Sequence, residues 1–409
     1  MLVVQKFGGT SVADSERIFN VAKRVIETYK KGNKVVVVLS AQGDTTDTLL
    51  EKAGEITSSP SKRELDMLLA TGEQQSVALM TMAIHKLGYP AISFNGFQFG
   101  MLTTSKHGNA RIRRVTEIER IKDELEKNSI VVCAGFQGFN RHKDVTTLGR
   151  GGSDTTAVAL SVALKADLCE IYTDVDGVYT ADPRYVNGAI KLNEISYEEM
   201  LELASLGAKV LHYRCVELAK KNNVNLIVRS SMTNEEGTLI REVTKVEKMI
   251  VSGIAVDKNT ARISVLDVPD QPGIAYLIFG RLSNSNITVD IILQSAGNGG
   301  NKKNVSFTVP EEDLEKAVEV LNDYKNEIGF REVTFDKNVA KLSVVGAGMI
   351  DAHGVATTMF ECLYDEGVNI DLISTSEIKI TVLVDQNVVN NAANALHAKF
   401  LDSNIKVGE

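Results

Sequence analysis

The chain has 409 residues, of which 44% are hydrophobic and 24% are charged, and its formal net charge is −8. These values are typical of a globular protein with two or three domains. Acidic and basic residues are mixed along the chain, which argues against a nucleic-acid partner, because such a partner needs a basic stripe. No apolar run reaches the ~20 residues of a membrane span, so no membrane partner is expected.

The N-terminal residues and the cysteines indicate the compartment. Residues 1–6 have neither the charged segment nor the long apolar core of a signal peptide. The cysteines lie far apart in apolar stretches and form no Cys-x-x-Cys pair; they are Cys133, Cys169, Cys215 and Cys362. Such cysteines are expected to be buried, reduced thiols. We therefore expect a soluble, cytoplasmic protein.

The first half of the chain alternates apolar runs with amphipathic segments. The runs rich in Val and Ile predict strands buried on both faces, at residues 2–6, 34–39, 130–134, 170–173 and 225–228. Helical patterns lie between them, at residues 14–31, 62–87, 116–127, 154–166, 197–205 and 213–222. This alternation predicts an α/β domain with helices on both faces of a parallel sheet.

A polar segment at residues 230–247 marks the predicted domain boundary, and beyond it the chain repeats itself. An offset of 81 residues, without a gap, aligns identical residues: Asp270/Asp351, Gly273/Gly354, Ala275/Ala356, Phe279/Phe360, Leu282/Leu363, Asp290/Asp371 and Ile292/Ile373. Each copy has the order strand, glycine-containing loop, helix, strand. Two copies of one small α+β fold are therefore predicted.

The first predicted strand ends in Lys6-Phe7-Gly8-Gly9 and is followed by a predicted helix. Glycines let backbone N–H groups approach an anion, and a helix start adds a partial positive charge. Lys6 would add a full positive charge for a phosphoryl group. Taken alone, the segment fits an ordinary glycine-containing turn equally well.

A second glycine-rich segment, TLGRGGSDTT at residues 147–156, precedes another predicted helix. An arginine held between glycines at a helix start suits bidentate binding of a carboxylate. Ser153 or Asp154 is expected to cap the helix, and a flexible loop with such a cap is the alternative interpretation. Two such loops in one chain favour an anion site.

Three further segments carry polar residues at strand or helix ends. TDVDGVYTADPR at residues 173–184 offers several carboxylates, although alone it fits an Asp-Gly turn. SAQGDTTD at residues 40–47 follows the second strand and fits either a substrate loop or a helix cap. Gly72 interrupts a helical pattern at a cost of ~1 kcal/mol relative to Ala, so a helix break is expected there. The break would present Glu73 to a substrate ammonium group, or leave it merely exposed.

Several common motifs are missing. The chain has no GxxxxGK[ST] and no HRD or DFG, so it is neither a P-loop NTPase nor a protein kinase. Gly346-Ala347-Gly348 lacks the third glycine of a dinucleotide turn, and the repeat explains its position. The six histidines show no metal-ligand spacing, so no metal ligand is predicted from the protein.

Together and in this order, the five segments resemble the aspartate kinases of the amino-acid kinase family, over nearly the whole chain. The C-terminal repeats resemble two ACT domains, as in short, monofunctional, lysine-responsive members. The resemblance implies a three-layer α/β/α catalytic domain at residues 1–245 and ferredoxin-like ACT domains at residues 250–330 and 335–409. It also implies that residues 250–260 pair into the second ACT domain.

The resemblance also implies the site residues. Catalytic roles fall on Lys6, Arg150 and Asp154. The aspartate site comprises Ser40, Thr45, Glu73, Arg150, Ser153 and Asp154. The ATP site comprises Lys6, Phe7, Gly8, Gly9, Thr173, Asp174, Tyr179, Asp182, Arg184, Lys209 and Val210. The effector site comprises Asp270, Gly273, Ile274, Ala275, Gln294, Asn369 and Ile370.

The implied reaction transfers the γ-phosphoryl group of ATP, with Mg²⁺, to the β-carboxylate of L-aspartate. This is the first step of lysine, threonine and methionine biosynthesis. The resemblance further implies inhibition by lysine, alone or with threonine, and a homodimer or larger assembly formed through the ACT domains. Two alternatives stay open: another amino-acid kinase such as a glutamate kinase, and a catalytically weak ACT-based amino-acid sensor.

Overall fold

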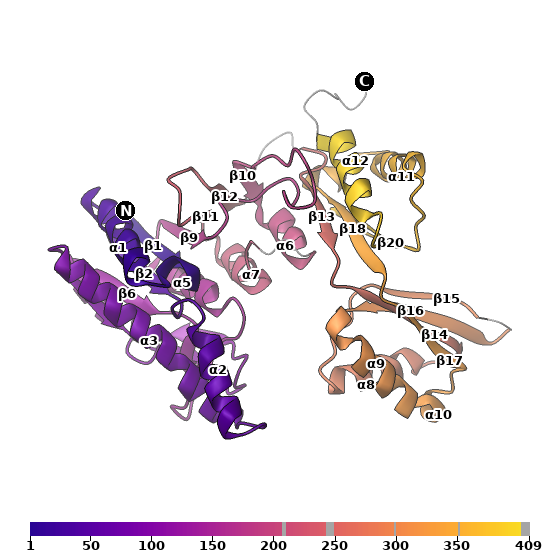
Figure 1. Cartoon of the computed structure of the whole chain (residues 1–409), viewed down its shortest axis with the longest axis horizontal. Coiled ribbons are helices and arrows are strands. Elements are labelled where there is room, and N and C mark those ends of the chain that lie inside the picture. Colours follow the sequence, from indigo (N-terminus) through magenta and orange to yellow (C-terminus); the bar gives the residue numbers. More distant parts are fainter. Residues whose placement is uncertain (207–209, 243–248, 298–299, 351, 402–409) are drawn as a thin grey trace. The chain divides into compact units, whose positions relative to one another are not determined.

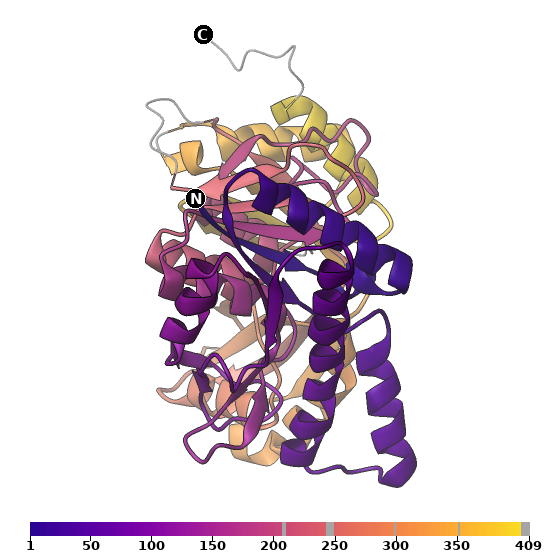
Figure 2. The ribbon, with the colours of Figure 1, turned by 90° about the vertical axis from the view of Figure 1, so that its left-hand side faces the viewer.

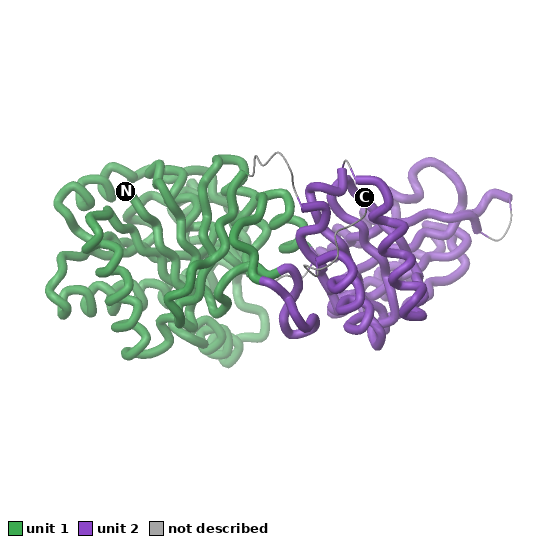
Figure 3. The backbone as a smooth tube through the Cα atoms, turned by 90° about the horizontal axis from the view of Figure 1, so that it is seen from above, with its two compact units in different colours: residues 1–179, 191–205, 209–246 green, residues 180–190, 206–208, 247–409 purple. Residues whose placement is uncertain are grey.

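The computed structural model describes residues 1–206, 210–242, 249–297, 300–350 and 352–401, which fall into two compact units (Figure 3). Unit 1, green in Figure 3, contains Met1–Tyr179, Lys191–Ser205 and residues 210–242. Unit 2, purple, contains Thr180–Ile190 and residues 249–401. The short segment Thr180–Ile190 thus comes from the N-terminal half of the sequence but packs with residues of the C-terminal half.

An eight-stranded sheet forms the centre of unit 1, in the order β10-β12-β11-β9-β1-β2-β6-β3. Its strands are β1 (Leu2–Phe7), β2 (Lys34–Leu39), β3 (Ala91–Phe94), β6 (Ile130–Ala134), β9 (Leu168–Thr173), β10 (Glu194–Ser196), β11 (Leu226–Ser230) and β12 (Thr238–Arg241). All neighbours are parallel except β11 and β12. From Val35 to Leu39, β2 is at most 1% exposed, so the apolar runs correctly predicted strands covered on both faces.

Helices cover both faces of this sheet, as predicted (Figure 1). The helices are α1 (Ser15–Lys30), α2 (Thr45–Ile56), α3 (Lys62–Lys86), α4 (Ile118–Glu126), α5 (Gly152–Leu164), α6 (Tyr197–Ser205) and α7 (Tyr213–Asn222). Gln5 of β1 donates a hydrogen bond to Thr28 of α1, whereas the next residue, Lys6, forms an ion pair with Asp154 of α5. Because successive strand residues point to opposite faces, α1 and α5 must lie on opposite sides of the sheet.

A smaller sheet adds to unit 1, in the order β5-β4-β7-β8. Its strands are β4 (Met101–Thr103), β5 (Ile112–Val115), β7 (Gln137–Phe139) and β8 (Val145–Thr147), and a short 3-10 helix, η1 (Gly9–Val12), follows β1. Figure 2 looks onto unit 1 and shows the indigo and purple helices α1, α2 and α3 on the side that faces the viewer. The strand β8 leads directly into the glycine-rich loop before α5.

The expected helix break at Gly72 is wrong. The helix α3 runs without interruption from Lys62 to Lys86 and contains both Gly72 and Glu73. A Cβ atom on Gly72 would lie 2.8 Å from Cβ of Ala41 and 3.3 Å from Cγ2 of Thr45. The glycine therefore allows α3 to pack closely against the loop after β2. The helix forms although glycine in its interior is ~1 kcal/mol less favourable than Ala.

Unit 2 contains two four-stranded antiparallel sheets. The first sheet has the strand order β15-β16-β14-β17. Its strands are β14 (Ala261–Pro269), β15 (Ile292–Ala296), β16 (Lys302–Val309) and β17 (Glu332–Asp336). The helices of this module are α8 (Ile274–Asn284), η2 (Glu311–Asp313), α9 (Leu314–Asp323) and α10 (Lys325–Ile328). The second sheet has the strand order β13-β18-β20-β19. Its strands are β13 (Gly253–Asp257), β18 (Val339–Val345), β19 (Leu372–Ser376) and β20 (Lys379–Asp385). The helices of this module are η3 (Ala347–Ile350), α11 (Val355–Asp365) and α12 (Val389–Leu401).

The two modules repeat one another as the sequence predicted. The helices α8 and α11 occupy equivalent positions in the repeat. Each is preceded by a glycine in the left-handed region, Gly273 with φ of 98° and Gly354 with φ of 88°. The strand β13 precedes the first module in the chain but pairs with β18 of the second module, from Gly253↔Val345 to Asp257↔Lys341.

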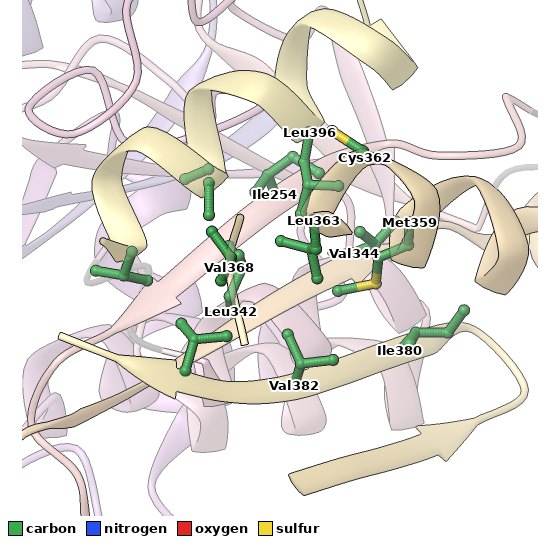
Figure 4. Close-up of a cluster of buried hydrophobic side chains, with 14 of the residues drawn as sticks. Ile254, Leu342, Val344, Met359, Cys362, Leu363, Val368, Ile380, Val382 and Leu396 are labelled. Atoms are coloured by element: carbon green, nitrogen blue, oxygen red, sulfur yellow. The ribbon is translucent and has the colours of Figure 1, made fainter. Parts of the chain in front are cut away.

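The second module has a continuous apolar core between its sheet and the helices α11 and α12 (Figure 4). Leu342 and Val344 of β18 face Met359 and Leu363 of α11, and all four are fully buried. Gly346 approaches Ile250 so closely that a Cβ atom would overlap the Ile250 carbonyl oxygen. The glycines after β18 are therefore explained by backbone packing within this module.

The segment Thr180–Ile190 belongs to this same core. Ala181 and Val186 are buried in it. The carbonyl oxygen of Thr180 accepts a hydrogen bond from Ile254 N at 2.7 Å, and its hydroxyl lies 2.8 Å from His397 Nε2. Apolar burial and hydrogen bonds thus attach this segment to β13 and α12.

The cysteines agree with the expectation from the sequence. Each of the four cysteines is buried and carries a free thiol. In the described part of the chain, no helix combines the length and the apolar character that a membrane span requires.

Replacing Thr180 by Val should loosen this attachment. The hydroxyl of Thr180 is buried, contacts His397 and accepts a hydrogen bond from Ile190 N at 2.9 Å. Leaving the Ile190 N–H unpaired costs about 1–3 kcal/mol. Hydrogen exchange measured by mass spectrometry should therefore show faster exchange of the amides in 180–190. Thr357→Val, at an exposed position of α11, is the control. Equal exchange in both variants would contradict the prediction.

Candidate active site

The predicted loops of unit 1 follow the strands of the central sheet. The neighbouring parallel strands β1, β2, β6, β9 and β11 end at Phe7, Leu39, Ala134, Thr173 and Ser230. The carboxyl ends of parallel strands meet at one edge of the sheet, which is where open α/β sheets bind ligands. The glycine-rich loop after Lys6, the loop from Ser40 to Thr45 and the segment from Thr173 therefore start from the same edge.

Lys6 and Asp154 form an ion pair at this edge. The ammonium of Lys6, on β1, lies 2.7 Å from Oδ1 of Asp154, in the first turn of α5. Lys6 is only 8% exposed, and the side chain of Asp154 is 14% exposed. The structure therefore holds a nearly buried cation at a helix start, with a carboxylate beside it that retains capacity to accept.

The helix α5 begins differently from the expectation. Its N-cap is Gly151, with φ of 68°, and neither Ser153 nor Asp154 caps it, because both lie within its first turn. A Cβ atom on Gly151 would overlap the ring of His212. The glycine thus permits both the left-handed conformation and the contact with His212.

Arg150 lies at the same helix start as Asp154. Burial lowers the pKa of His212, and the positive charges of Arg214 and Arg150 lower it further, whereas Asp154 opposes them. Arg150 and Asp154 thus both act on one imidazole ring. Arg150 is exposed, so its guanidinium is available to a ligand in solution.

Glu73 presents an isolated carboxyl group to the loop after β2. It is 3% exposed, its Oε1 accepts a hydrogen bond from Ala41 N at 3.1 Å, and its Oε2 has no partner among the described residues. Burial raises the pKa of Glu73 from 4.5 to about 8, although the Ala41 N–H partly opposes this. A buried carboxyl group with one open oxygen suits an ammonium ligand.

The loop from Ser40 to Thr45 packs between the other elements of the site. A Cβ atom on Gly9 would lie 2.6 Å from the carbonyl oxygen of Ala41, so the two loops are in close contact. Ser40 N donates to the carbonyl oxygen of Phe7 at 3.2 Å. Thr45 donates its hydroxyl to Gln42 O at 2.6 Å and can still accept a hydrogen bond. The structure thus brings Ser40, Thr45 and Glu73 together beside Gly8 and Gly9.

The residues predicted for ATP binding divide between the two units. In unit 1, Thr173 donates to Asp174 Oδ1 at 3.0 Å, and Tyr179 donates to Asp176 Oδ1 at 3.0 Å. Asp182 and Arg184 form an ion pair at 2.6 Å within Thr180–Ile190, which packs in unit 2. Lys209 lies outside the described residues, and Val210 lies shortly before α7.

The residues predicted for effector binding lie in both modules of unit 2. Gly273 caps α8, Ile274 is its buried first residue and Ala275 is exposed. Asp270 lies 3.3 Å from the ammonium of Lys303, and Gln294 is exposed on β15. In the second module, Asn369 is exposed and Ile370 packs against the apolar core.

Sequence reasoning missed a group of residues around the glycine-rich loop before α5. Asp66 of α3 contacts His107, Gly108 and Thr147, and Arg214 of α7 contacts Leu148. Asp66 precedes Glu73 by about two helical turns, which places both on one face of α3. This spacing was the only available signal, because the partners of Asp66 are distant in sequence.

Glu73→Gln should stabilise the protein increasingly as the pH rises. The folded-state pKa of about 8 exceeds the ordinary 4.5, so the buried carboxyl group is favourable below about 4.5 and becomes unfavourable as it ionises through pH 8. Gln stays neutral, so its advantage should reach a few kcal/mol above pH 8. Melting temperatures at pH 5, 7 and 9 measure the effect, with the exposed Glu55→Gln as control. A difference that does not change with pH would refute the assignment.

Comparisons with known proteins agree with this architecture. Residues 1–230 match the amino acid kinase family, and residues 263–324 and 342–400 match the ACT domain. The aspartokinase of Bacillus sp. (strain MGA3) is 51% identical over 400 residues, which cover 98% of this chain and 97% of that protein.

Solved structures agree as well. The Escherichia coli aspartokinase III in complex with aspartate and ADP (R-state) superimposes with a TM-score of 0.80 at 26% identity, covering 98% of this chain and 99% of that one. Its complex with lysine and aspartate (T-state) gives a TM-score of 0.79 at 26% identity, covering 98% of this chain and all of that one. The chain therefore belongs to the aspartokinases, the aspartate kinases of the amino acid kinase family that carry C-terminal ACT domains.

Proposed function

We propose that this enzyme transfers the γ-phosphoryl group of ATP to the β-carboxylate of L-aspartate and releases ADP and 4-phospho-L-aspartate. Its relatives are aspartokinases, and one with the same fold binds aspartate and ADP. In the cytoplasm, where its reduced thiols fit, this step would begin the synthesis of lysine, threonine and methionine.

The ion pair between Lys6 and Asp154 is the observation that carries this proposal. It places a nearly buried cation at the carboxyl edge of a parallel sheet and at a helix start. Both features favour the negative charge of a phosphoryl group in transfer. A carboxylate has about four acceptor positions, so Asp154, whose Oδ1 contacts the Lys6 ammonium, can also accept from a substrate ammonium.

Aspartate brings three charged groups, and the site offers a partner for two of them. The exposed guanidinium of Arg150 suits the α-carboxylate, to which arginine binds in a bidentate manner. Glu73, with its open Oε2, and Asp154 suit the α-ammonium group. Ser40, Thr45 and Ser153 add hydrogen-bonding capacity around them. The β-carboxylate is then left free to point at the γ-phosphorus.

The chemistry requires no general base. A β-carboxylate is already ionised at neutral pH, so one of its oxygens can attack the γ-phosphorus directly. The bond from the γ-phosphorus to the bridging oxygen breaks, and ADP carries away the electron pair. Lys6 stabilises the negative charge on the phosphoryl oxygens during the transfer.

Magnesium would arrive with the nucleotide. No group of three His, Cys, Asp or Glu residues in the described part of the chain is arranged to hold a metal ion alone. Mg²⁺ typically binds through substrate phosphates, water and one or two carboxylates, for which Asp154 is suitably placed. When bound, the ion would neutralise charge on the β- and γ-phosphates.

The decisive assay measures ADP release from MgATP with aspartate, with glutamate and with neither. Turnover with aspartate well above that with glutamate is expected. Equal turnover would point to a less selective amino-acid kinase, because one methylene changes binding by only ~1–3 kcal/mol through contact alone. A lack of turnover with either acid would reject the proposal and favour a non-catalytic sensor.

Arg150→Ala should raise the KM for aspartate by roughly 10- to 100-fold, because charge-assisted hydrogen bonds to the α-carboxylate are lost. The KM for ATP should change little. Arg113→Ala, at an exposed position on β5, is the control and should leave both constants unchanged. An unchanged KM for aspartate in Arg150→Ala would remove Arg150 from the substrate site.

Regulation by lysine, alone or with threonine, is part of the proposal. A relative of the same fold binds lysine together with aspartate. The edge strand β15 exposes every residue, including Ile292 at 50% and Leu293 at 39%. Exposed edge strands invite pairing with another chain, so a homodimer or larger assembly through the ACT domains is proposed as well.

Lysine should inhibit the wild-type enzyme, and Gln294→Ala should weaken this inhibition, because the exposed Gln294 is one of the proposed effector residues. Activity without lysine should be the same for both proteins. Turnover is measured with lysine and threonine added singly and together, alongside sedimentation to determine the assembly. Activity that stays constant throughout the titrations would indicate that the ACT domains serve assembly only.

A further inference from the structure

A buried carboxylate outside the proposed substrate contacts connects α3 to the loop that carries Arg150. Asp66 of α3 is 1% exposed. Thr147, the last residue of β8, donates its hydroxyl to Asp66 Oδ1 at 2.6 Å. Gly108 N donates to both carboxylate oxygens, at 3.0 and 3.1 Å, and His107 Nδ1 lies 2.7 Å from Oδ2. One carboxylate thus binds two segments that are distant in sequence.

These two segments are also attached to each other. Ala110 N donates to the carbonyl oxygen of Thr147 at 2.9 Å. A Cβ atom on Gly149, which has φ of 77°, would lie 3.0 Å from the carbonyl oxygen of Gly108. Residues 107–110 and 147–149 therefore form one block, held together by a hydrogen bond and by close backbone packing. We refer to this block as the Arg150 support.

Arg214 holds the Arg150 support from the side of α7. Its Nη1 donates to Leu148 O at 2.7 Å, and its Nη2 donates to Ala110 O at 2.9 Å. Because Arg214 belongs to α7, this attachment does not connect the support to α3. Asp66 supplies side-chain hydrogen bonds from α3.

The helix α3 also carries Glu73, about two turns after Asp66 and on the same face. At ~1.5 Å per residue, the Cα atoms of the two residues lie about 10 Å apart along the helix axis. The helix is continuous between them, so this spacing is fixed. Asp66 therefore connects the Arg150 support to the helix that carries Glu73.

We propose that Asp66 is a positioning residue for the amino-acid substrate, acting through Thr147 on the loop of Arg150. This inference rests on the proposed function, in which Arg150 binds the α-carboxylate and Glu73 the α-ammonium group. Holding both α-groups fixed determines how far the side-chain carboxylate reaches toward the γ-phosphorus. A loosened support would let a diacid one methylene longer adjust its position, so Asp66 contributes to the preference for aspartate over glutamate.

Thr147→Val tests the proposal with little change in volume. It should raise the KM for aspartate on the order of tenfold, the equivalent of one hydrogen bond to a charged group. The KM for ATP should stay within about twofold, and the ratio of kcat/KM for aspartate to that for glutamate should fall several-fold. Thr147→Ser, which keeps the hydroxyl, should restore wild-type values.

The neighbouring residue offers a matched control. Thr146 is as buried as Thr147, and its hydroxyl lies 2.6 Å from that of Thr103, away from the loop. Thr146→Val should reduce stability by a similar amount and leave the KM for aspartate unchanged. If Thr147 had only a structural role, the KM for aspartate would change equally in the two variants.

Asp66→Asn provides an independent variant that keeps the shape of the side chain. It should raise the KM for aspartate, and combining it with Thr147→Val should raise the KM by less than the product of the two single effects, because the two side chains share one hydrogen bond. Additive effects would overturn the proposal, as would equal effects of Thr147→Val and Thr146→Val, or an equal rise in the KM for ATP. If the wild type fails to phosphorylate aspartate, the proposed function falls, and this role falls with it. An active wild type with any of the other outcomes removes the role of Asp66 alone.

Discussion

The contact between the Lys6 ammonium and the Asp154 carboxylate joins the first strand of the chain to the start of α5. A cation that is 8% exposed needs a charged partner, because burying an unpaired charge is costly. The pair therefore fixes where α5 begins relative to β1. Because the loop of Arg150 leads into α5, the position of the guanidinium depends on the same contact.

Glycines make the other contacts of this edge possible. Gly9 and Gly72 both approach Ala41 so closely that a side chain at either position would displace the loop after β2. Gly151 lies against His212 in the same manner. These close approaches bring the loop after β1 and the helix α3 against the loop after β2, and the loop before α5 against His212. The site is thus assembled mainly from backbone packing, on which a few charged side chains are carried.

The sequence predicted the sheet and the repeated modules because both rest on patterns local in the chain. Apolar runs rich in Val, such as residues 34–39, are typical of strands buried on both faces, and the matching positions of Gly273 and Gly354 follow from the 81-residue repeat. The break at Gly72 and the cap at Ser153 or Asp154 were wrong, since glycine propensity and capping preference ignore tertiary contacts with Ala41 and His212. Asp66 was missed for the same reason, because its partners come from the strand β8 and from the loop of His107.

The segment Thr180–Ile190 has a consequence for dividing the molecule. Both of its flanking stretches belong to unit 1, whereas Ala181 and Val186 are buried in the core of unit 2. A chain shortened after residue 242 would keep these two apolar side chains and lose everything that covers them. Such a fragment would expose an apolar surface in the segment that directly follows Tyr179. The two units are therefore interlocked along the chain, and a cut after residue 242 would leave residues 180–190 without the core that buries Ala181 and Val186.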